Sequence, residues 1–341
     1  MSAPTSPRWR VESWDPAYGA SAEDQTGAPR QTKLEVSLDV ELAASGWRPL
    51  APPSVGPGRW SSVLFVDGVR RIDAIGWLDE RAGPDGTPAM GLLASYAAGV
   101  VRCRADGAKL LAAQVRRGLF TGAEGIGDLV TRMGSYRSVP VPIRAGGTAG
   151  SGPTPAQQLS EAMQAQMRAL EASLAQFAAQ SAPEGQPDGW AGPDSELLVV
   201  DGPLQRGSRL PGMLGYAKTH ATLYLPAELN RLVGTLLPGQ RTPLFALLDR
   251  APRYSWYLKL PGGGAGWAGV VRVECAGELT VPAAVALAES SQPLLCRYAS
   301  TEYKDARAPQ NLYPIGGLER ELRRRLGDQG LLHRAIRAAA R

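Results

Sequence analysis

An α/β fold, in which a mixed sheet is flanked by helices, is the fold class that this sequence predicts. Three observations lead to it. Strand-like apolar runs come first along the chain, a long segment with helical periodicity follows at 155–180, and further strand-like runs then alternate with segments that favour helix. The chain has 341 residues and can therefore bury a large core, as one domain or two.

Three consecutive strands are expected early in the chain, at 61–67, 69–79 and 90–103. Each is rich in β-branched and apolar residues, as strands are. Asp67-Gly68 separates the first pair and Gly-Pro-Asp-Gly at 83–86 separates the second, and both sequences favour tight turns. This pattern predicts an antiparallel meander. A shorter run at 34–42 alternates apolar and polar residues, which is typical of a half-buried strand.

The segment 155–180 predicts a helix because its large apolar residues recur at spacings of three and four. A short helix at 107–117 and a glycine-rich loop are expected before it. After it we expect strands at 196–201, 253–260, 267–275 and 294–298, and a helix at 226–237. Three antiparallel strands, a helix and a buried strand that ends in an aspartate are the element order of a ribonuclease H-like fold.

Composition divides the chain unevenly. Residues 1–33 are polar with scattered tryptophans, which predicts a loosely ordered N-terminal arm. We expect the rest, 34–341, to form one domain with a helical and loop insertion at about 104–193 and a basic C-terminal helix at 317–341. The 40 glycines and 28 prolines predict long loops, but they do not predict a wholly disordered chain.

The formal net charge of +5 permits nucleic acid as a partner without establishing it. Most of the excess lies between Gly317 and Arg341, where seven arginines accompany three acidic residues. Arg320, Arg323, Arg324 and Arg325 are either a solvated helix face or a face that contacts phosphates. Both interpretations stay open on the sequence alone.

The cysteines, Cys103, Cys275 and Cys296, show no metal-ligand spacing and no even disulfide set. They lie in or beside apolar runs, so we expect buried thiols in a reducing cytoplasm. No apolar run is as long as a membrane span, and the first thirty residues lack the apolar core of a signal peptide. These observations predict a cytoplasmic protein with no membrane partner.

Asp67 and Asp201 are the candidate metal ligands, because each ends a buried strand-like run just before a glycine. Mg²⁺ and Mn²⁺ prefer oxygen ligands, and carboxylates at two neighbouring strand ends can hold them. The helix offers Glu161 and Glu171. At about 100° per residue, Glu171 lies roughly 80° from the centre of the apolar stripe and Glu161 about 160°. Glu171 is therefore the better third ligand, although an Asp-Gly after a strand is also a common structural turn.

Lys218 lies in a segment, 215–220, that begins about a dozen residues after the second Asp-Gly. It could stabilise negative charge on a phosphate under attack, or it could be a surface lysine. His220 is one of two histidines, and a lone histidine is usually structural. The sequence holds no Gly-x-Ser-x-Gly and no phosphate-binding Gly-x-x-x-x-Gly-Lys-[Ser/Thr], so acyl transfer and P-loop ATP hydrolysis are not supported.

Four short segments in this order resemble the NurA family of nucleases, and together they span residues 60 to 340. They are Phe65–Arg71, Leu198–Leu204, Gly215–Lys218 and Asp305–Ile315. The resemblance implies a ribonuclease H-like core, in which Asp67 matches the first acidic motif, Asp201 the second, and Lys218 the basic position after it. Arg70 lies in the first segment and is a further candidate for DNA contact.

The resemblance also implies an activity and partners. The activity is that of a Mn²⁺-dependent deoxyribonuclease with two ions (Mn²⁺ or Mg²⁺) per site, 5′–3′ exonuclease and single-strand endonuclease activity, and a role in DNA end resection and double-strand break repair. Its substrates would be single-stranded DNA and duplex ends. A HerA-type hexameric translocase would be its partner, and the nuclease would be a homodimer associated with the nucleoid.

The tail departs from the family pattern. Many relatives carry a histidine or aspartate just after the Tyr-Pro of this segment, whereas here Tyr313-Pro314 is followed by no ligand before Glu319. Asp305 or Asn311 could substitute, and we count Asp305 among the expected metal ligands. The departure also favours an alternative function, a non-catalytic DNA-binding clamp or adaptor subunit of a translocase.

Overall fold

The computed structural model describes residues 30–53, 60–78, 89–144, 153–180, 195–204 and 212–340. The expected turn at 83–86 and the proline-rich segment 182–193 lie outside the described residues, as does nearly all of the N-terminal arm. None of the described helices is long and apolar enough to cross a membrane.

The described strands form one large mixed sheet and one small pair. The large sheet has the order β2-β11-β12-β13-β9-β8-β3-β4-β5-β7-β6, and β1 pairs with β10. The bounds are β1 (Arg30–Gln31), β2 (Glu35–Ser37), β3 (Trp60–Leu78), β4 (Ala89–Arg104), β5 (Gly107–Thr121), β6 (Leu129–Thr131), β7 (Gly134–Pro140), β8 (Ser195–Asp201), β9 (Met213–Ala217), β10 (Thr222–Leu223), β11 (Phe245–Leu248), β12 (Arg253–Lys259) and β13 (Val270–Ala276).

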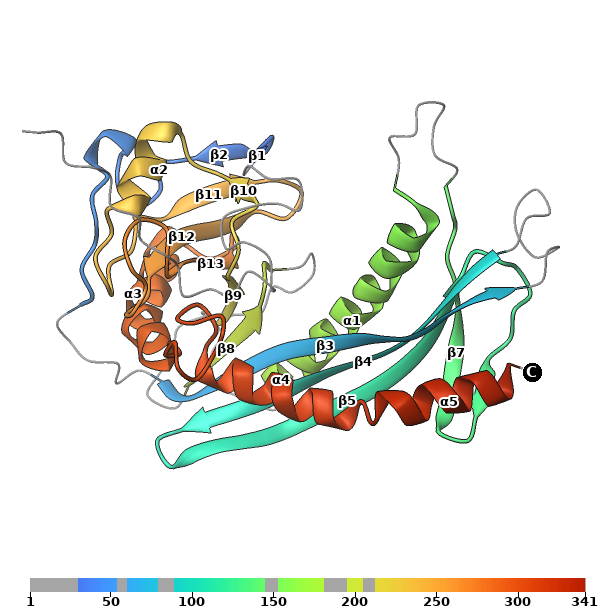
Figure 1. Ribbon diagram of the computed structural model, residues 1–341. Helices are drawn as coiled ribbons and strands as arrows, with labels where there is room; N and C mark the ends of the chain where they lie inside the picture. Colours follow the sequence, from blue (N-terminus) through green and yellow to red (C-terminus); the bar gives the residue numbers. More distant parts are fainter. Residues whose placement is uncertain are drawn as a thin grey trace, which may run out of the picture. The chain divides into compact units, whose positions relative to one another are not determined.

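Five α-helices are described, and Figure 1 labels them. They are α1 (Pro155–Gln180), α2 (Ala227–Gly234), α3 (Val281–Tyr298), α4 (Tyr313–Arg325) and α5 (Gln329–Ala339), with a short 3-10 turn at Ala44–Gly46. The α1 helix has the predicted bounds. Together with the mixed sheet, these helices confirm the predicted α/β class.

The central strands have the expected ribonuclease H-like order. Along the chain these five strands follow one another as β3, β4, β5, β8 and β9, whereas in the sheet their order is β5-β4-β3-β8-β9. In the chain, α1 lies between β5 and β8. β8 and β9 run parallel. This arrangement makes β3 and β8 neighbours, so the two strands that carry Asp67 and Asp201 lie next to each other.

The predicted turn at Asp67-Gly68 is wrong, because β3 runs through it without a break. Gly68 serves a close approach instead. A Cβ atom at this position would lie 2.4 Å from Glu171 Oε1 and 3.1 Å from Met167 Cγ, so the missing side chain makes room for α1. The glycine therefore reflects packing between strand and helix, which the local sequence does not reveal.

Two other expected elements are also wrong. Residues 107–117 form the start of β5 instead of a helix, and a two-residue turn joins β5 to β4 as a hairpin. Pairing with β4 outweighs the weak helix preference of this alanine- and leucine-containing run. Residues 294–298 form the last turn of α3 instead of a strand. That helix begins at Thr280, whose side chain accepts a hydrogen bond from the Ala283 N–H.

The basic C-terminal helix expected at 317–341 is two helices. α4 ends at Arg325, Gly327 has a φ of +84°, and Asp328 caps α5 by accepting a hydrogen bond from the Leu331 N–H. A residue in the left-handed conformation ends a helix, and glycine adopts this conformation most readily. The sequence pattern missed this break between two arginine-containing segments.

The described chain groups into two compact units. The first comprises residues up to Phe65, 102–108 and 178–316. One of its clusters packs Leu225, Val233, Phe245 and Tyr257 beneath the partly buried Trp47 and Trp267. A buried Arg241 donates hydrogen bonds to both carboxylate oxygens of Glu41, at 2.7 and 2.8 Å, and fixes the segment before β3.

The second unit comprises residues 66–101, 109–177 and 317–341. Its strands pack against α5 through a cluster of Leu93, Leu119, Tyr136 and Ile336. α4 approaches β4 closely at Gly99, where a Cβ atom would lie 3.0 Å from Leu318 Cδ1. The unit therefore holds α1 at Gly68 and α4 at Gly99 through two glycine contacts.

Candidate metal centre

Asp201 is the last residue of β8, a strand whose residues 197–199 are buried. Gly202 follows with a φ of +92°, which favours glycine and lets the chain turn away. The Asp201 backbone is held in register with Tyr216 of β9. The carboxylate therefore stands at the end of a rigid, buried strand, as predicted.

Asp67 lies within β3 and is 4% exposed. Its Oδ1 accepts a hydrogen bond from the Gly68 N–H at 2.7 Å. On the other side of Gly68 lies the half-buried Glu171 of α1, whereas Glu161 is exposed. This confirms the helical phase that the apolar stripe of 155–180 predicts.

Glu319 lies on the buried side of α4 and is 8% exposed. The buried residues of this helix, Ile315, Leu318, Leu322 and Leu326, recur every three or four positions, and Glu319 lies among them. A glutamate on an apolar helix stripe pays a desolvation cost unless it has a partner or a ligand. Arg323 Nη2 lies 3.9 Å from Glu319 Oε2, and the place of Glu319 on this stripe makes it a candidate ligand.

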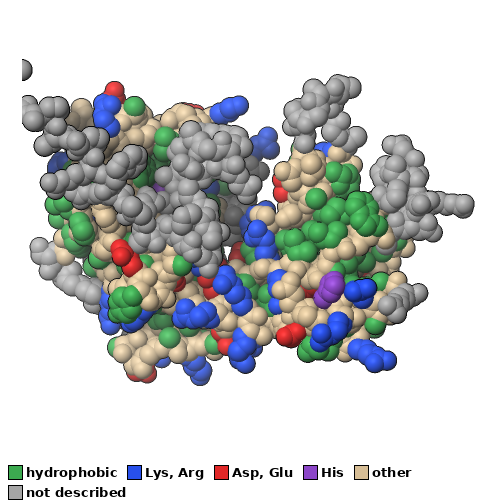
Figure 2. Space-filling model, in the orientation of Figure 1, with side chains coloured by type: hydrophobic (Ala, Val, Ile, Leu, Met, Phe, Trp, Pro, Cys, Tyr) green, Lys and Arg blue, Asp and Glu red, His purple; other side chains and the backbone are tan. Residues whose placement is uncertain are grey.

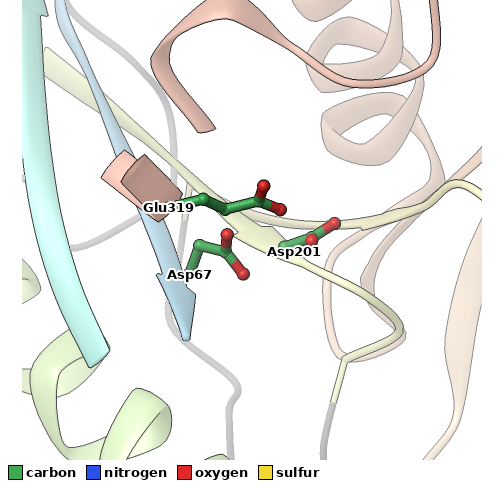
Figure 3. Close-up of side chains that lie close together, drawn as sticks. All are labelled: Asp67, Asp201 and Glu319. Carbon is green, nitrogen blue, oxygen red and sulfur yellow. The ribbon is translucent and has the colours of Figure 1, made fainter. Parts of the chain in front are cut away.

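Asp67, Asp201 and Glu319 come together although they are far apart in the sequence. Each contributes a carboxylate oxygen, and these oxygens all lie within 4.8 Å of one another. Figure 3 shows the three carboxyl groups pointing toward one another from β3, β8 and α4. Three acidic groups this close repel each other strongly unless cations lie among them.

Lys218 supplies one cation. It follows β9 directly, and its Nζ lies 2.6 Å from Asp201 Oδ2 in an ion pair that is largely buried on both sides. The same Nζ donates a hydrogen bond to Asn311 Oδ1 at 3.0 Å. Asn311 Nδ2 in turn donates to Asp305 Oδ2 at 2.7 Å. A continuous polar chain thus leads from Asp201 to Asp305.

The donor set fits a divalent cation. Carboxylate oxygens are the ligands that Mg²⁺ and Mn²⁺ prefer, and a separation under 5 Å lets one or two ions share them. Asp201 Oδ1 is a buried acceptor with no hydrogen-bond partner among the described residues. Within the three-carboxylate group, Lys218 pairs with Asp201 and Arg323 Nη2 lies 3.9 Å from Glu319 Oε2.

The predicted ligands are only partly brought together. Asp67 and Asp201 belong to the three-carboxylate group, whereas Glu171 and Asp305 do not, within the part of the chain that the structure describes. Glu171 lies beside Gly68, one residue from Asp67. Asp305 reaches the group only through Asn311 and Lys218.

Glu319 is the member of the three-carboxylate group that the sequence does not predict as a ligand. The family pattern places a ligand just after Tyr313-Pro314, and the most conspicuous residues of the segment that follows are its arginines. One signal was available: Glu319 lies four residues after Ile315 and three before Leu322, on the apolar stripe of α4. A charged residue in such a stripe is unusual and marks a candidate site.

The expected DNA-binding arginines of α4 are exposed. Figure 2 shows Lys and Arg side chains dispersed over the face of the molecule in view. Arg324 and Arg325 both pair with Glu321, at 2.9 and 2.7 Å, and this pairing lowers the pKa of Glu321 to about 2. Arg323 Nη2 lies 3.9 Å from Glu319 Oε2. Both sequence interpretations retain support, because the side chains are paired within the helix and still solvent-exposed.

Arg70 is exposed on β3, two residues beyond Gly68. Burial of part of its side chain lowers its pKa, the positive charge of Arg168 lowers it further, and Glu171 raises it. Arg70, Arg168 and Glu171 are therefore electrostatic neighbours. A second cation close to Arg70 makes this part of the unit attractive to a phosphate.

His220 is structural. It is 2% exposed, its Nε2 lies 2.9 Å from the Val270 carbonyl oxygen, and burial lowers its pKa to about 4. Its ring packs edge-on against Trp267 at a centroid distance of 5.2 Å. The predicted free thiols are also found: Cys103 and Cys275 are buried and Cys296 is half-buried.

No protein-family model matches this sequence, and no curated protein is similar to it in sequence. The fold is similar to that of the NurA nuclease from Sulfolobus solfataricus, with 12% identity, a TM-score of 0.42, and coverage of 82% of this chain and 84% of that chain. It is also similar to endonuclease V from Bacillus subtilis (13% identity, TM-score 0.30, 81% of this chain and 84% of that chain). The catalytic domain of human endonuclease V is a further neighbour (14% identity, TM-score 0.32, 82% and 91%).

The first of these structures bears the name of the family that the sequence motifs resemble.

Proposed function

We propose that this protein is a metal-dependent deoxyribonuclease, a hydrolase of phosphodiester bonds. The observation that carries the proposal is the meeting of Asp67, Asp201 and Glu319 within 4.8 Å, with Lys218 paired to Asp201. Such a group binds divalent cations, and a lysine beside it can meet the anionic substrate. The four motifs that resemble the NurA family support the same conclusion.

Each residue has a role in the proposal. The three carboxylates hold the cations, which when bound neutralise phosphate charge and lower the pKa of water. β3 and β8 are adjacent strands of the large sheet, and each carries one of the carboxylates. Lys218 orients Asp201 and stabilises the negative charge that builds on the phosphate.

DNA would be bound by exposed arginines. Arg320, Arg323, Arg324 and Arg325 on α4 lie on the same helix as Glu319, and Arg70 follows Asp67 on β3. Two of the three ligand-bearing elements, α4 and β3, therefore also carry cationic side chains that can hold the DNA backbone. Contacts of this kind position the substrate without reading its sequence.

The family resemblance extends the proposal further. We propose Mn²⁺ or Mg²⁺ as the cofactor with two ions per site, 5′–3′ exonuclease and single-strand endonuclease activity, and a role in DNA end resection. A HerA-type hexameric translocase would be the partner of a homodimeric nuclease in the cytoplasm, at the nucleoid. The nuclease domain would extend over 34–341, with residues 1–33 as an N-terminal arm.

The test is cleavage of end-labelled single-stranded DNA and of duplex ends in Mn²⁺. We expect loss of the labelled strand with the wild-type protein, and none with chelator or with Asp67→Ala or Asp201→Ala. Metal-free thermal stability of Asp67→Ala should hold or rise, because this change removes one like charge from the group. Asp201→Ala also removes the ion-pair partner of Lys218, so its metal-free stability should fall below that of Asp67→Ala. A variant with near wild-type cleavage would contradict the site.

The same assay tests the alternative. A protein that binds DNA in a salt-dependent manner but cleaves no substrate in any divalent metal would be a clamp or adaptor. Glu319 weakens that alternative, since it supplies a third carboxylate where the tail motif lacks its usual ligand.

A further inference from the structure

Asn311 is the centre of a buried polar chain that the proposed chemistry does not yet use. Its side chain is fully buried. Its Oδ1 accepts a hydrogen bond from Lys218 Nζ, and its Nδ2 donates one to Asp305 Oδ2. Backbone bonds fix it as well: its N–H donates to the Arg307 carbonyl, and its carbonyl accepts from the Ser300 N–H.

The charges at its two ends determine how the amide is oriented. Turning the amide by 180° would place NH₂ against an ammonium and a carbonyl oxygen against a carboxylate, and both contacts would be repulsive. Asp305 is itself fixed, because its other oxygen, Oδ1, accepts a hydrogen bond from the Arg307 N–H at 2.8 Å. Asp305 therefore determines which atom Asn311 presents to Lys218.

We infer that Asn311 and Asp305 are positioning residues that share the Lys218 ammonium between Asn311 and Asp201. This inference rests on the nuclease function proposed above, and it assigns Asp305 a role other than that of a metal ligand. The Lys218 side chain is 8% exposed, so water cannot replace a lost acceptor at low cost. Without Asn311 Oδ1, Lys218 would depend on Asp201 and would compete with the metal for it.

The test is a double-mutant cycle on Mn²⁺ affinity in the absence of DNA, measured by titration calorimetry on the full chain. Asn311→Leu should raise the Mn²⁺ Kd roughly tenfold, since losing one hydrogen bond to a charged group shifts an equilibrium by about that factor. Lys218→Met should tighten Mn²⁺ binding. In the Lys218→Met background, Asn311→Leu should change the Kd by less than about twofold, because the residue acts through Lys218.

Asp305→Asn is the second variant, and it covers the case in which Asn311→Leu does not fold. The new amide has only one acceptor oxygen. If this oxygen accepts the hydrogen bond from the Arg307 N–H, the NH₂ group at position 305 faces the NH₂ group of Asn311. The Asn311 amide must then turn, and its oxygen no longer accepts a hydrogen bond from Lys218. We expect a rise in the Mn²⁺ Kd of at least about threefold, again absent in the Lys218→Met background.

Asp249→Asn is the matched control in the same unit. Asp249 is also half-buried, and its Oδ1 also accepts from the N–H two residues on, that of Ala251, at 2.8 Å. Its Oδ2 pairs with Arg253 instead of an asparagine. The Mn²⁺ Kd of this variant should stay within about twofold of the wild-type value, because the described contacts of Asp249 are with Ala251 and Arg253 and not with Lys218 or Asn311.

Additive effects would overturn the inference: if Asn311→Leu and Asp305→Asn shift the Kd equally with and without Lys218, both residues act on the fold alone. An unchanged or lower Kd in either single variant would also overturn it. A wild-type protein that binds no Mn²⁺ would overturn the proposed function together with the inference. Mn²⁺ binding and DNA cleavage by the wild type, with an additive cycle, would overturn the inference only.

Discussion

Replacing Glu319 by glutamine should separate the stability of the metal-free protein from its response to metal. The change keeps the size of the side chain on the buried stripe of α4 and removes one of three neighbouring negative charges. We therefore expect Glu319→Gln to be more stable than the wild type in chelator and to lose most of its stabilisation by Mn²⁺.

The structure gives the magnitude. At a separation of 4.8 Å, two full charges repel by about 3.5 kcal/mol at an effective dielectric constant of 20. Glu319→Gln removes two such repulsions. It also removes the contact with Arg323 at 3.9 Å, which is worth at most about 1 kcal/mol because that arginine is half-exposed. The two repulsions less the Arg323 contact give an upper limit of about 6 kcal/mol at this dielectric constant, whereas each repulsion is only about 0.9 kcal/mol at that of water. Since Lys218 also offsets part of the Asp201 charge, we expect a net gain of about 1–2 kcal/mol in the free energy of unfolding.

The assay is thermal unfolding with chelator and with Mn²⁺ at about one hundred times the Kd, a concentration that stabilises the wild type by about 2.7 kcal/mol. The two proteins should exchange rank: the variant unfolds at the higher temperature without metal, and the wild type at the higher temperature with it. Glu321→Gln is the control, because Glu321 lies on the same helix and pairs with Arg324 and Arg325 instead. An Mn²⁺ response of Glu319→Gln equal to that of the wild type would refute Glu319 as a ligand.

Three further predictions follow from the same contacts. Glu171→Gln should lower Mn²⁺-dependent cleavage at least about tenfold, because the Glu171 carboxylate lies beside Gly68, the residue after Asp67. Glu161→Gln should leave the cleavage rate unchanged, and single-turnover rates with the reverse ranking would contradict this prediction. Replacing Arg323, Arg324 and Arg325 by serine should weaken binding to DNA of any sequence. It should also reduce the slope of log K against log salt concentration by about one unit per lost contact. An unchanged slope, together with reduced stability or a changed size of the protein in solution, would assign these arginines a structural role. Burial lowers the pKa of His220 from 6.5 to about 4, so the unfolded chain binds a proton more readily than the folded protein. As the pH falls from 6.5 to 4, the free energy of unfolding should therefore decrease by up to roughly 3 kcal/mol. His220→Phe should remove that part of the pH dependence and His333→Gln should keep it; denaturation profiles with equal slopes for His220→Phe and the wild type would contradict the assignment.

Local patterns in the sequence were sufficient for the elements that depend on periodicity. The apolar spacing of 155–180 gave both the bounds of α1 and the difference between Glu161 and Glu171. The buried run before Asp201 gave β8 and its terminal carboxylate. In these cases one face of a single element determines the outcome, so the sequence pattern contains the necessary information.

Long-range contacts decided the rest. Gly68 continues a strand because α1, about a hundred residues later, packs on it, and no local turn preference could show this. Glu319 completes the carboxylate group only after β3, β8 and α4 have been assembled. Asp305 has the residue type of a ligand, but the structure places it behind Asn311, and only the tertiary fold distinguishes these two positions.

The most direct test of the central claim is a crystal structure of the protein soaked in Mn²⁺, with anomalous scattering measured at the manganese edge. We predict one or two anomalous peaks bounded by carboxylate oxygens of Asp67, Asp201 and Glu319, and their absence from crystals of Asp67→Ala. Peaks held by other residues, or no peak at these carboxylates in millimolar Mn²⁺, would contradict the assignment of this group as the metal centre.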